Sequence, residues 1–254
     1  MAIHAQDIVY LDNNATTSIA PEVVETMMPY LTDFHGNPSS AYTFGSQITK
    51  ALALAREQLA FLLNCEPKEI IFTSCGTESN NTALESALRT THKKHIVTTQ
   101  VEHSAIKNHC ASLESRGYAI TYLSVDSEGC LNLKDLEKAI RSDTALISVM
   151  WANNETGVLF PIEETAQLCQ KKNILLHTDA VQVVGKLPID LKKIPLHFLS
   201  LSGHKLHAPK GVGALFVRQK TRFSPYLIGG SQENKKRAGT ENVASIVGLG
   251  KAAQ

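Results

Sequence analysis

The sequence predicts an α/β fold in which a mainly parallel sheet is covered by helices on both faces. Over most of the 254 residues, short apolar runs alternate with longer segments of helical periodicity, which is the pattern of repeated β-α-β units. The chain is also long enough to bury a large core. No internal repeat, low-complexity stretch or linker divides it, so we expect residues 1–254 to form one large domain with an N-terminal segment.

The N-terminal quarter predicts one strand, a turn and two helices. Residues 8–11 are a short β-prone run, and residues 12–17 have the composition of a turn. Pro21 suits the first position of a helix. After a loop at residues 36–40, apolar residues recur at helical spacing over residues 47–63, which predicts a long amphipathic helix.

Strands and helices then alternate along the chain. We expect strands at residues 69–73, 95–99, 118–125, 145–150 and 174–177, and helices at residues 77–88, 103–115, 133–140, 162–172 and 243–253. Two more apolar runs, at residues 194–199 and 212–217, flank a short polar connection that contains Lys205. We expect both runs to be strands of the same sheet.

Composition argues against several classes of function. The net charge is +1 and the basic residues are spread out, so there is no electrostatic footprint for nucleic acid. The one basic cluster, residues 235–237, is expected to be a solvated loop or an interface segment. No apolar run reaches the roughly 18–20 residues of a membrane span, and the first twenty residues lack the features of a secretory signal.

Cysteine usage indicates a reducing compartment. The five cysteines are odd in number and widely spaced, and none forms a CxxC pair. This pattern argues against a disulfide framework and against a zinc site, and we expect a cytoplasmic protein without a metal. We expect Cys75 to have a packing role, and Cys65, Cys110, Cys130 and Cys169 to be small buried residues.

Polar residues follow five of the predicted strands. Ligands of open α/β sheets bind outside the carboxyl ends of the strands, so these positions are where a site is expected. Lys205 follows one of them, near Gly203 and Gly211, and a partly desolvated lysine has a lowered pKa and can form a Schiff base. An ordinary surface lysine is the alternative interpretation.

The other strand ends suit a phosphorylated pyridine. Residues 74–79 lie between a strand and a helix and predict a phosphate cradle, or else simple helix capping. Asp179, if it is not merely a structural group, can keep a ring nitrogen protonated, and Gln182 can reach the same ligand. His103 can lie over a flat ring, although a helix cap or a surface position is the alternative. Together these groups predict pyridoxal 5'-phosphate (PLP) as the cofactor.

Long runs of the sequence resemble the cysteine desulfurases, most closely their nitrogen-fixation branch, within the fold-type I, class V aminotransferase group. The resemblance covers essentially the whole chain. The runs that carry it are YLDNNATT (10–17), GNPSS (36–40), FTSCGTESNN (72–81), VMWANNETG (149–157), HTDAVQ (177–182), SGHKLHAPKGVG (202–213) and RAGTENVASIVGLG (237–250).

The resemblance implies a role for each matching residue. Lys205 would form the Schiff base with PLP and move a proton, His103 would stack on the ring, and Asp179 would pair with its nitrogen. The remaining matches are Gln182 for the phenolic oxygen, Asn154 beside cofactor and substrate, Gly76, Thr77, Ser202 and His204 for the phosphate, and Thr240 for the phosphate of a neighbouring subunit. A homodimer with shared sites is therefore expected.

The resemblance also implies the reaction. A cysteine desulfurase converts L-cysteine to L-alanine and carries the sulfur as an enzyme persulfide to an iron–sulfur scaffold or another acceptor protein. Another class V enzyme (an aminotransferase or a selenocysteine lyase) and a non-catalytic PLP-binding fragment are the alternatives. The family continues beyond the position of Gln254 through a small domain that carries the persulfide cysteine, so we expect this chain to be inactive alone.

Overall fold

The computed structural model describes residues 8–40 and 42–254. Residues 1–7, part of the stretch in which no secretory signal is expected, lie outside the described residues. The helices are α1 (Pro21–Met27), α2 (Pro29–Thr32), α3 (Thr43–Leu63), α4 (Gly76–Thr91), α5 (Ser104–Ser115), α6 (Leu133–Ala139), α7 (Ile162–Lys172), α8 (Gln232–Lys235) and α9 (Val243–Ala252), with 3-10 turns at Pro67–Glu69 and Gly203–Lys205.

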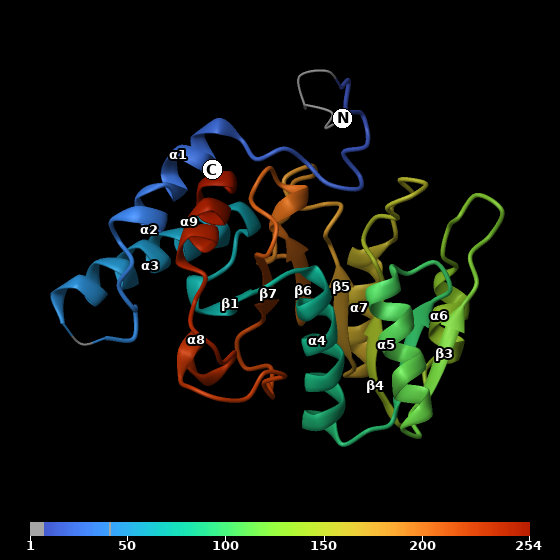
Figure 1. The fold of residues 1–254 in the computed structure, drawn as a ribbon. Coiled ribbons are helices and arrows are strands. Elements are labelled where there is room, and N and C mark those ends of the chain that lie inside the picture. The colour runs from blue at the N-terminus through green and yellow to red at the C-terminus, as the bar shows by residue number, and fades with distance from the viewer. Residues whose placement is uncertain (1–7, 41) are drawn as a thin grey trace.

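One seven-stranded sheet lies at the centre of the described chain (Figure 1). Its strands are β1 (Ile70–Thr73), β2 (His95–Thr99), β3 (Ala119–Leu123), β4 (Thr144–Ser148), β5 (Leu175–Asp179), β6 (Phe198–Ser202) and β7 (Gly213–Val217), in the order β1-β7-β6-β5-β4-β2-β3. Only β7 runs against its neighbours, since it pairs antiparallel with both β1 and β6. The prediction of a mainly parallel α/β sheet is confirmed.

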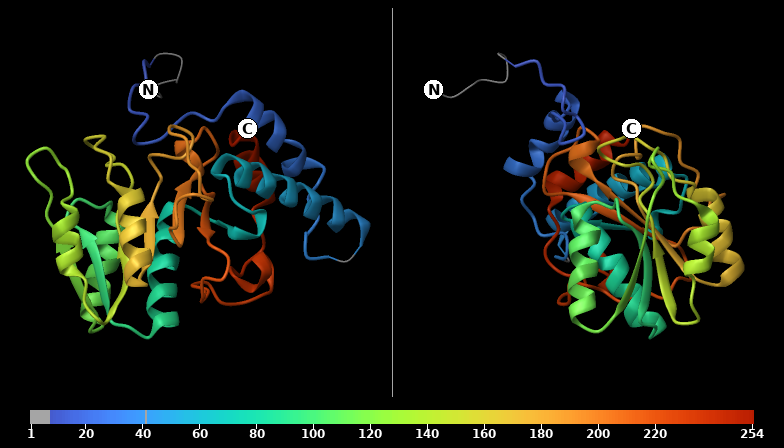
Figure 2. Two further views of the ribbon diagram at one scale, coloured as in Figure 1. Left: turned by 180° about the vertical axis from the view of Figure 1, so that it is seen from behind. Right: turned by 90° about the vertical axis from the view of Figure 1, so that its right-hand side faces the viewer.

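Successive residues of each strand enter two separate cores, because side chains alternate between the faces of a sheet. Ile96 and Leu146 pack with α4 and α5 on one face. Val97 and Ile147 pack with α3, α6, α7 and α9 on the other. The right-hand view of Figure 2 shows the sheet between these helices, so the prediction of helices on both faces is also confirmed.

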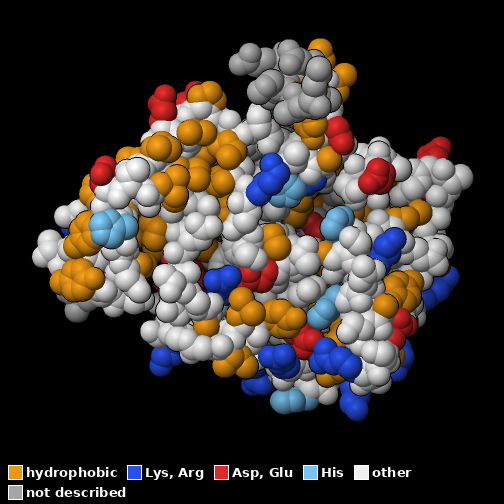
Figure 3. All heavy atoms as spheres, viewed as in Figure 1, with side chains coloured by type: hydrophobic (Ala, Val, Ile, Leu, Met, Phe, Trp, Pro, Cys, Tyr) orange, Lys and Arg blue, Asp and Glu red, His pale blue; other side chains and the backbone are white. Residues whose placement is uncertain are grey.

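The N-terminal helices α1 and α3 both pack against the C-terminal helix α9. A Cβ added at Gly250 of α9 would lie 2.5 Å from the Cα of Ala55 in α3, so α9 and α3 approach closely at this point. Large hydrophobic side chains gather on the surface over α1 and α2 (Figure 3), among them Val24, Met28 and Leu31.

One strand prediction is wrong, and a second is correct only at its C-terminal end. Residues 8–11 form no strand. Val9 and Leu11 are 85% and 83% exposed, and none of the seven described strands pairs with them. The apolar run at residues 194–199 enters the sheet only from Phe198. Its carbonyls at Ile194 and Leu196 instead accept hydrogen bonds from the Arg218 side chain.

The remaining predicted elements are present, with ends that differ by a few residues at most. The helix at residues 162–172 has the predicted bounds, and that at residues 47–63 begins earlier, at Thr43. Among the described residues no helix is both long and apolar enough to cross a bilayer.

Candidate active site

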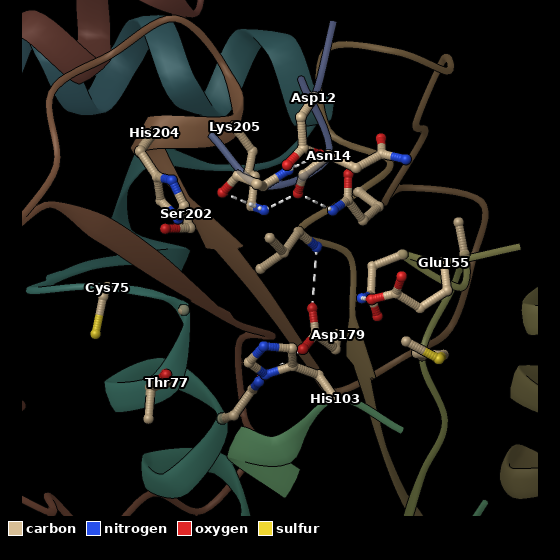
Figure 4. Close-up of a pocket in the computed structure, with 18 residues that line it drawn as sticks. Asp12, Asn14, Cys75, Thr77, His103, Glu155, Asp179, Ser202, His204 and Lys205 are labelled. Carbon is tan, nitrogen blue, oxygen red and sulfur yellow. Dashed lines mark hydrogen bonds between the residues drawn. The ribbon is translucent and has the colours of Figure 1, made fainter. Parts of the chain in front are cut away.

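A cavity of about 470 Å³ opens at one edge of the sheet (Figure 4). Because β1 and β6 each run antiparallel to the β7 strand between them, β1, β6, β5, β4 and β2 all point their carboxyl ends toward this edge. The cavity has the size of a small-cofactor site. It is lined by Asp12, Asn14, Ala15, Cys75, Gly76, Thr77, Asn80, His103, Met150, Ala152, Asn154, Glu155, Asp179, Val181, Gln182, Ser202, His204 and Lys205.

The fold brings nine of the ten predicted site residues to this cavity. They come from five different strand ends, which sequence spacing alone could not place together. Thr240 is the exception: it lies in a separate pocket of about 170 Å³, together with Arg237 and Glu241. Of the residues that the resemblance implies for the site, all but Thr240 therefore line one cavity.

Lys205 lies in the 3-10 turn that follows β6. Its Nζ donates hydrogen bonds to the carbonyl oxygens of Asn14 and Ala15, the latter at 2.9 Å. Partial burial, and next the charge of Lys186, lower the pKa of the Lys205 amine. Both effects favour the neutral amine, which is the form that attacks a carbonyl carbon.

Asp179 is the last residue of β5 and is buried. Its Oδ2 accepts a hydrogen bond from Asn80 Nδ2 at 2.7 Å, and its Oδ1 accepts one from the backbone N–H of Val181 at 3.0 Å. Burial raises the pKa of the Asp179 carboxyl group. A cation placed beside this carboxylate in the cavity would offset the cost of burying its charge.

His103 is the N-cap of α5. Its Nδ1 accepts a hydrogen bond from the backbone N–H of Ala105 at 3.1 Å, so in the neutral ring the proton lies on Nε2. Figure 4 shows the imidazole beside Asp179. The helix-cap interpretation and the cavity position are therefore both correct for this residue.

The opposite end of the cavity has the features of a phosphate cradle. A Cβ added at Gly76 would meet Val181 Cγ2 at 2.8 Å, so the site requires a residue without a side chain there. Ser202 Oγ is buried and has no hydrogen-bond partner among the described residues. The start of α4, with Gly76 and Thr77, supplies backbone N–H groups that have no partner within the helix.

The N-terminal segment closes over the cavity. His204 Nδ1 contacts Thr16 Oγ1 at 3.1 Å, and the backbone N–H of Thr17 donates to the His204 carbonyl at 2.9 Å. Gln182 Nε2 donates to the Asn14 carbonyl at 3.0 Å. These contacts join residues more than 160 positions apart in the sequence.

Four polar residues of the cavity were not predicted as site residues. They are Asp12, Asn14, Asn80 and Glu155. Asn80 could have been found, because it lies one helical turn after Gly76 and so faces the same side of α4. Glu155 accepts a hydrogen bond from Asn154 Nδ2 at 2.6 Å, so two neighbouring polar residues of the cavity are paired with each other.

The cysteines occupy three kinds of position. Cys110 and Cys169 are fully buried, and burial raises the pKa of each thiol to about 12. Cys65 and Cys75 are half-buried, and Cys75 lines the cavity. The expectation of burial is wrong for Cys130, which is exposed in the loop before α6. No metal-binding group of three or more His, Cys, Asp or Glu residues occurs in the part of the chain that the structure describes.

These groups fit a phosphorylated pyridine aldehyde such as PLP. A partly desolvated amine suits the aldehyde, a buried carboxylate suits a protonated ring nitrogen, and an orphaned hydroxyl at a helix N-terminus suits a phosphate. All of them face one cavity. The arrangement can hold such a cofactor by its two ends and its aldehyde carbon.

Comparison with known proteins gives a consistent result. Residues 9–254 match the class-V aminotransferase family. The chain is 56% identical to a cysteine desulfurase of Nostoc sp. and 55% identical to the cysteine desulfurase NifS of Azotobacter vinelandii, over 97% of its own length and 62% of theirs. The chain therefore spans about 62% of the length of the curated relatives it matches.

Solved structures show the same fold. A NifS-like protein superposes with a TM-score of 0.93 at 42% identity, covering 96% of this chain and 68% of that one. A structure described as SspA in complex with cysteine superposes with a TM-score of 0.94 at 40% identity, covering 96% of this chain and 72% of that one.

Proposed function

Because the chain belongs to the class-V aminotransferase family, we propose that residues 1–254 are the PLP-binding large domain of a cysteine desulfurase. One observation carries the proposal: Lys205, Asp179 and the cradle at Gly76 and Ser202 line a single cavity. The relatives named as cysteine desulfurases at 50–58% identity support this reaction over others of the family.

Each side chain would hold a different part of the cofactor. Lys205 Nζ would bind the aldehyde carbon after it releases the carbonyls of Asn14 and Ala15. Asp179 would pair with the ring nitrogen, and the bonds from Asn80 and Val181 would keep its carboxylate in place. When bound, PLP supplies an electron sink for negative charge that develops at the substrate Cα.

The other predicted residues would complete the site. His103 would stack on the ring and offer the proton on Nε2, and Gln182 would contact the phenolic oxygen. Gly76, Thr77, Ser202 and His204 would bind the phosphate, and Asn154 would lie beside cofactor and substrate. Lys205, once displaced by the substrate amine, would move a proton at the substrate Cα.

We infer that L-cysteine is the substrate, which is supported by the relatives' names and by the cysteine in the SspA structure. The balanced step converts L-cysteine and a protein thiol to L-alanine and a protein persulfide. Burial and a raised pKa make Cys110 and Cys169 unsuited to accept sulfur, and Cys130 does not line the cavity. Burial also raises the pKa of the Cys65 thiol to about 12. We therefore propose that none of these four cysteines accepts the sulfur.

The same proposal extends to the oligomeric state of the protein and to the acceptor of the sulfur. Thr240 does not line the cavity of its own chain, which supports a role toward the phosphate of a second copy in a homodimer. The persulfide sulfur would pass to an iron–sulfur scaffold or another acceptor protein in the cytoplasm, for general cluster assembly or nitrogen fixation.

The test is a titration of the PLP-loaded chain with L-cysteine. We expect a change in the visible absorbance that is lost in Lys205→Ala and retained in Lys210→Ala, an exposed lysine of the same connection. We expect no steady sulfide release. A chain that binds PLP but shows no response to L-cysteine would contradict the desulfurase reaction. With a reducing thiol present to release sulfide from any persulfide, steady release of sulfide and an equal amount of L-alanine would contradict the expectation that the chain is inactive alone.

A further inference from the structure

Residues 233–237, which we call the brace, join the C-terminal part of the chain to the phosphate cradle. They overlap α8, which lies beside β1 in Figure 1. Arg237 donates from Nε to Glu78 Oε1 at 2.8 Å and from Nη2 to Glu78 Oε2 at 3.1 Å. Arg237 is half-buried in this pair, so the basic cluster at residues 235–237 is not simply the solvated loop expected from its sequence.

Glu78 connects the brace to the cradle. It lies in the first turn of α4, directly after Thr77, and its Oε2 also accepts a hydrogen bond from the backbone N–H of Ser74 at 2.8 Å. Burial opposes ionisation, but the bonds from Arg237 and Ser74 keep the pKa of Glu78 below its ordinary value. The carboxylate therefore holds the loop between β1 and α4, directly before Gly76.

Charge explains why Arg237 matters at this position. An unpaired carboxylate in the first turn of α4 would repel a phosphate bound at the same helix start. The two parallel bonds from Arg237 neutralise Glu78 and fix its direction. Glu78 then remains free to hold the Ser74 N–H, and the loop keeps the shape that presents the cradle to the cavity.

The other end of the brace is anchored separately. Glu233 is buried, its carboxylate accepts bonds from Arg56 at 2.6 and 2.8 Å, and its Oε2 also accepts the backbone N–H of Phe72 at 2.9 Å. Glu233, Asn234 and Lys235 have φ of 48°, 56° and 65°. Three consecutive left-handed residues other than glycine are unfavourable, and such a run persists only where its surroundings fix it.

We propose that Arg237 is a positioning residue for the cofactor phosphate and acts through Glu78. The inference rests on the proposed function, since it needs the PLP phosphate in the cradle of Gly76, Thr77 and Ser202. Arg237 does not line the cavity, so its proposed effect on the phosphate passes through Glu78. Its effect is confined to the phosphate end of the site.

The test compares two ligands, PLP and pyridoxal, which lacks the phosphate. In Arg237→Gln we expect the affinity for PLP to fall by about tenfold, the size of one lost charge-assisted interaction, while the affinity for pyridoxal changes by less than about twofold. The matched control is Arg116→Gln, because Arg116 pairs with Glu85 in the second half of the same helix. This control should leave both affinities unchanged.

A rescue separates positioning from general loss of structure. Glu78→Gln combined with Arg237→Gln removes the unpaired carboxylate and leaves an amide oxygen for the Ser74 N–H, so we expect PLP affinity to recover. Arg237→Lys keeps the charge without the two parallel bonds and should lie between wild type and Arg237→Gln. It also provides the comparison if Arg237→Gln unfolds, which circular dichroism would show.

Four outcomes would overturn the inference. An unchanged PLP affinity in a folded Arg237→Gln, or an equal loss for PLP and pyridoxal, would show that Arg237 does not act on the phosphate. Failure of the rescue would show that it does not act through Glu78. A wild-type chain that does not bind PLP at all would overturn the proposed function as well, so the two failures are distinguishable.

Discussion

Replacing Glu233 by alanine should destabilise the fold strongly, because the substitution leaves a half-buried arginine without its partner. The Glu233 side chain is 4% exposed and that of Arg56 is 18% exposed. Breaking such a buried pair costs about 3–5 kcal/mol of unfolding free energy. For a chain of this length each kcal/mol lowers the melting temperature by roughly 2 °C, so we expect a decrease of about 6–10 °C.

The assay is thermal and urea unfolding of the cofactor-free chain followed by circular dichroism. The control is Asp135→Ala, because the Asp135–Lys138 pair is 57% and 77% exposed and such pairs contribute at most about 1 kcal/mol. Arg56→Ala combined with Glu233→Ala should cost much less than the sum of the single variants, since each single variant already removes the interaction. A Glu233→Ala variant as stable as the Asp135→Ala control would show that the Arg56–Glu233 pair does not stabilise the fold.

Three further predictions concern the cavity, the pH dependence and the thiols. Gly76→Ala should lower PLP affinity by at least about tenfold and spare pyridoxal, because its Cβ would occupy the cradle and meet a valine side chain at 2.8 Å; equal loss for both ligands would contradict this. Burial lowers the pKa of His177 from 6.5 to about 3, so between these two pH values the unfolded chain binds this proton and the folded chain does not. Urea titrations should therefore show that the free energy of unfolding decreases as the pH is lowered through this range, by up to about 1.4 kcal/mol per pH unit from His177. An unchanged slope in His177→Asn would contradict the lowered pKa of His177. A thiol reagent should modify Cys130 first and reach Cys110 and Cys169 only on unfolding; early labelling of either would contradict their burial.

Elements with a complete local signal could be predicted from the sequence. Helix α7 combines apolar periodicity with acidic residues in its first turn and Asn173 in a left-handed C-cap, and its predicted bounds are correct. The run at residues 8–11 has β-prone residues but pairs with none of the described strands. Strand propensity alone does not make a strand, because a strand needs hydrogen bonds from a partner.

The candidate site was predictable in its residue types and not in its contacts. The strand ends that carry Asp179 and Lys205 could be recognised one at a time, and the rule for open α/β sheets placed them at one edge. Nothing in the local sequence indicates that Asn14 and Ala15 bond to Lys205, because these contacts span about 190 residues. The Arg237–Glu78 pair was hidden for the same reason, since it joins two segments 159 positions apart.

The proposed function depends most directly on the binding of the cofactor by Lys205. The most direct test is to load the chain with PLP, reduce it with borohydride and locate the label by peptide mass mapping. We expect a single label on Lys205, none in Lys205→Ala, and an unchanged label in Lys210→Ala. A label on another lysine of the wild-type chain, or one that persists in Lys205→Ala, would contradict it.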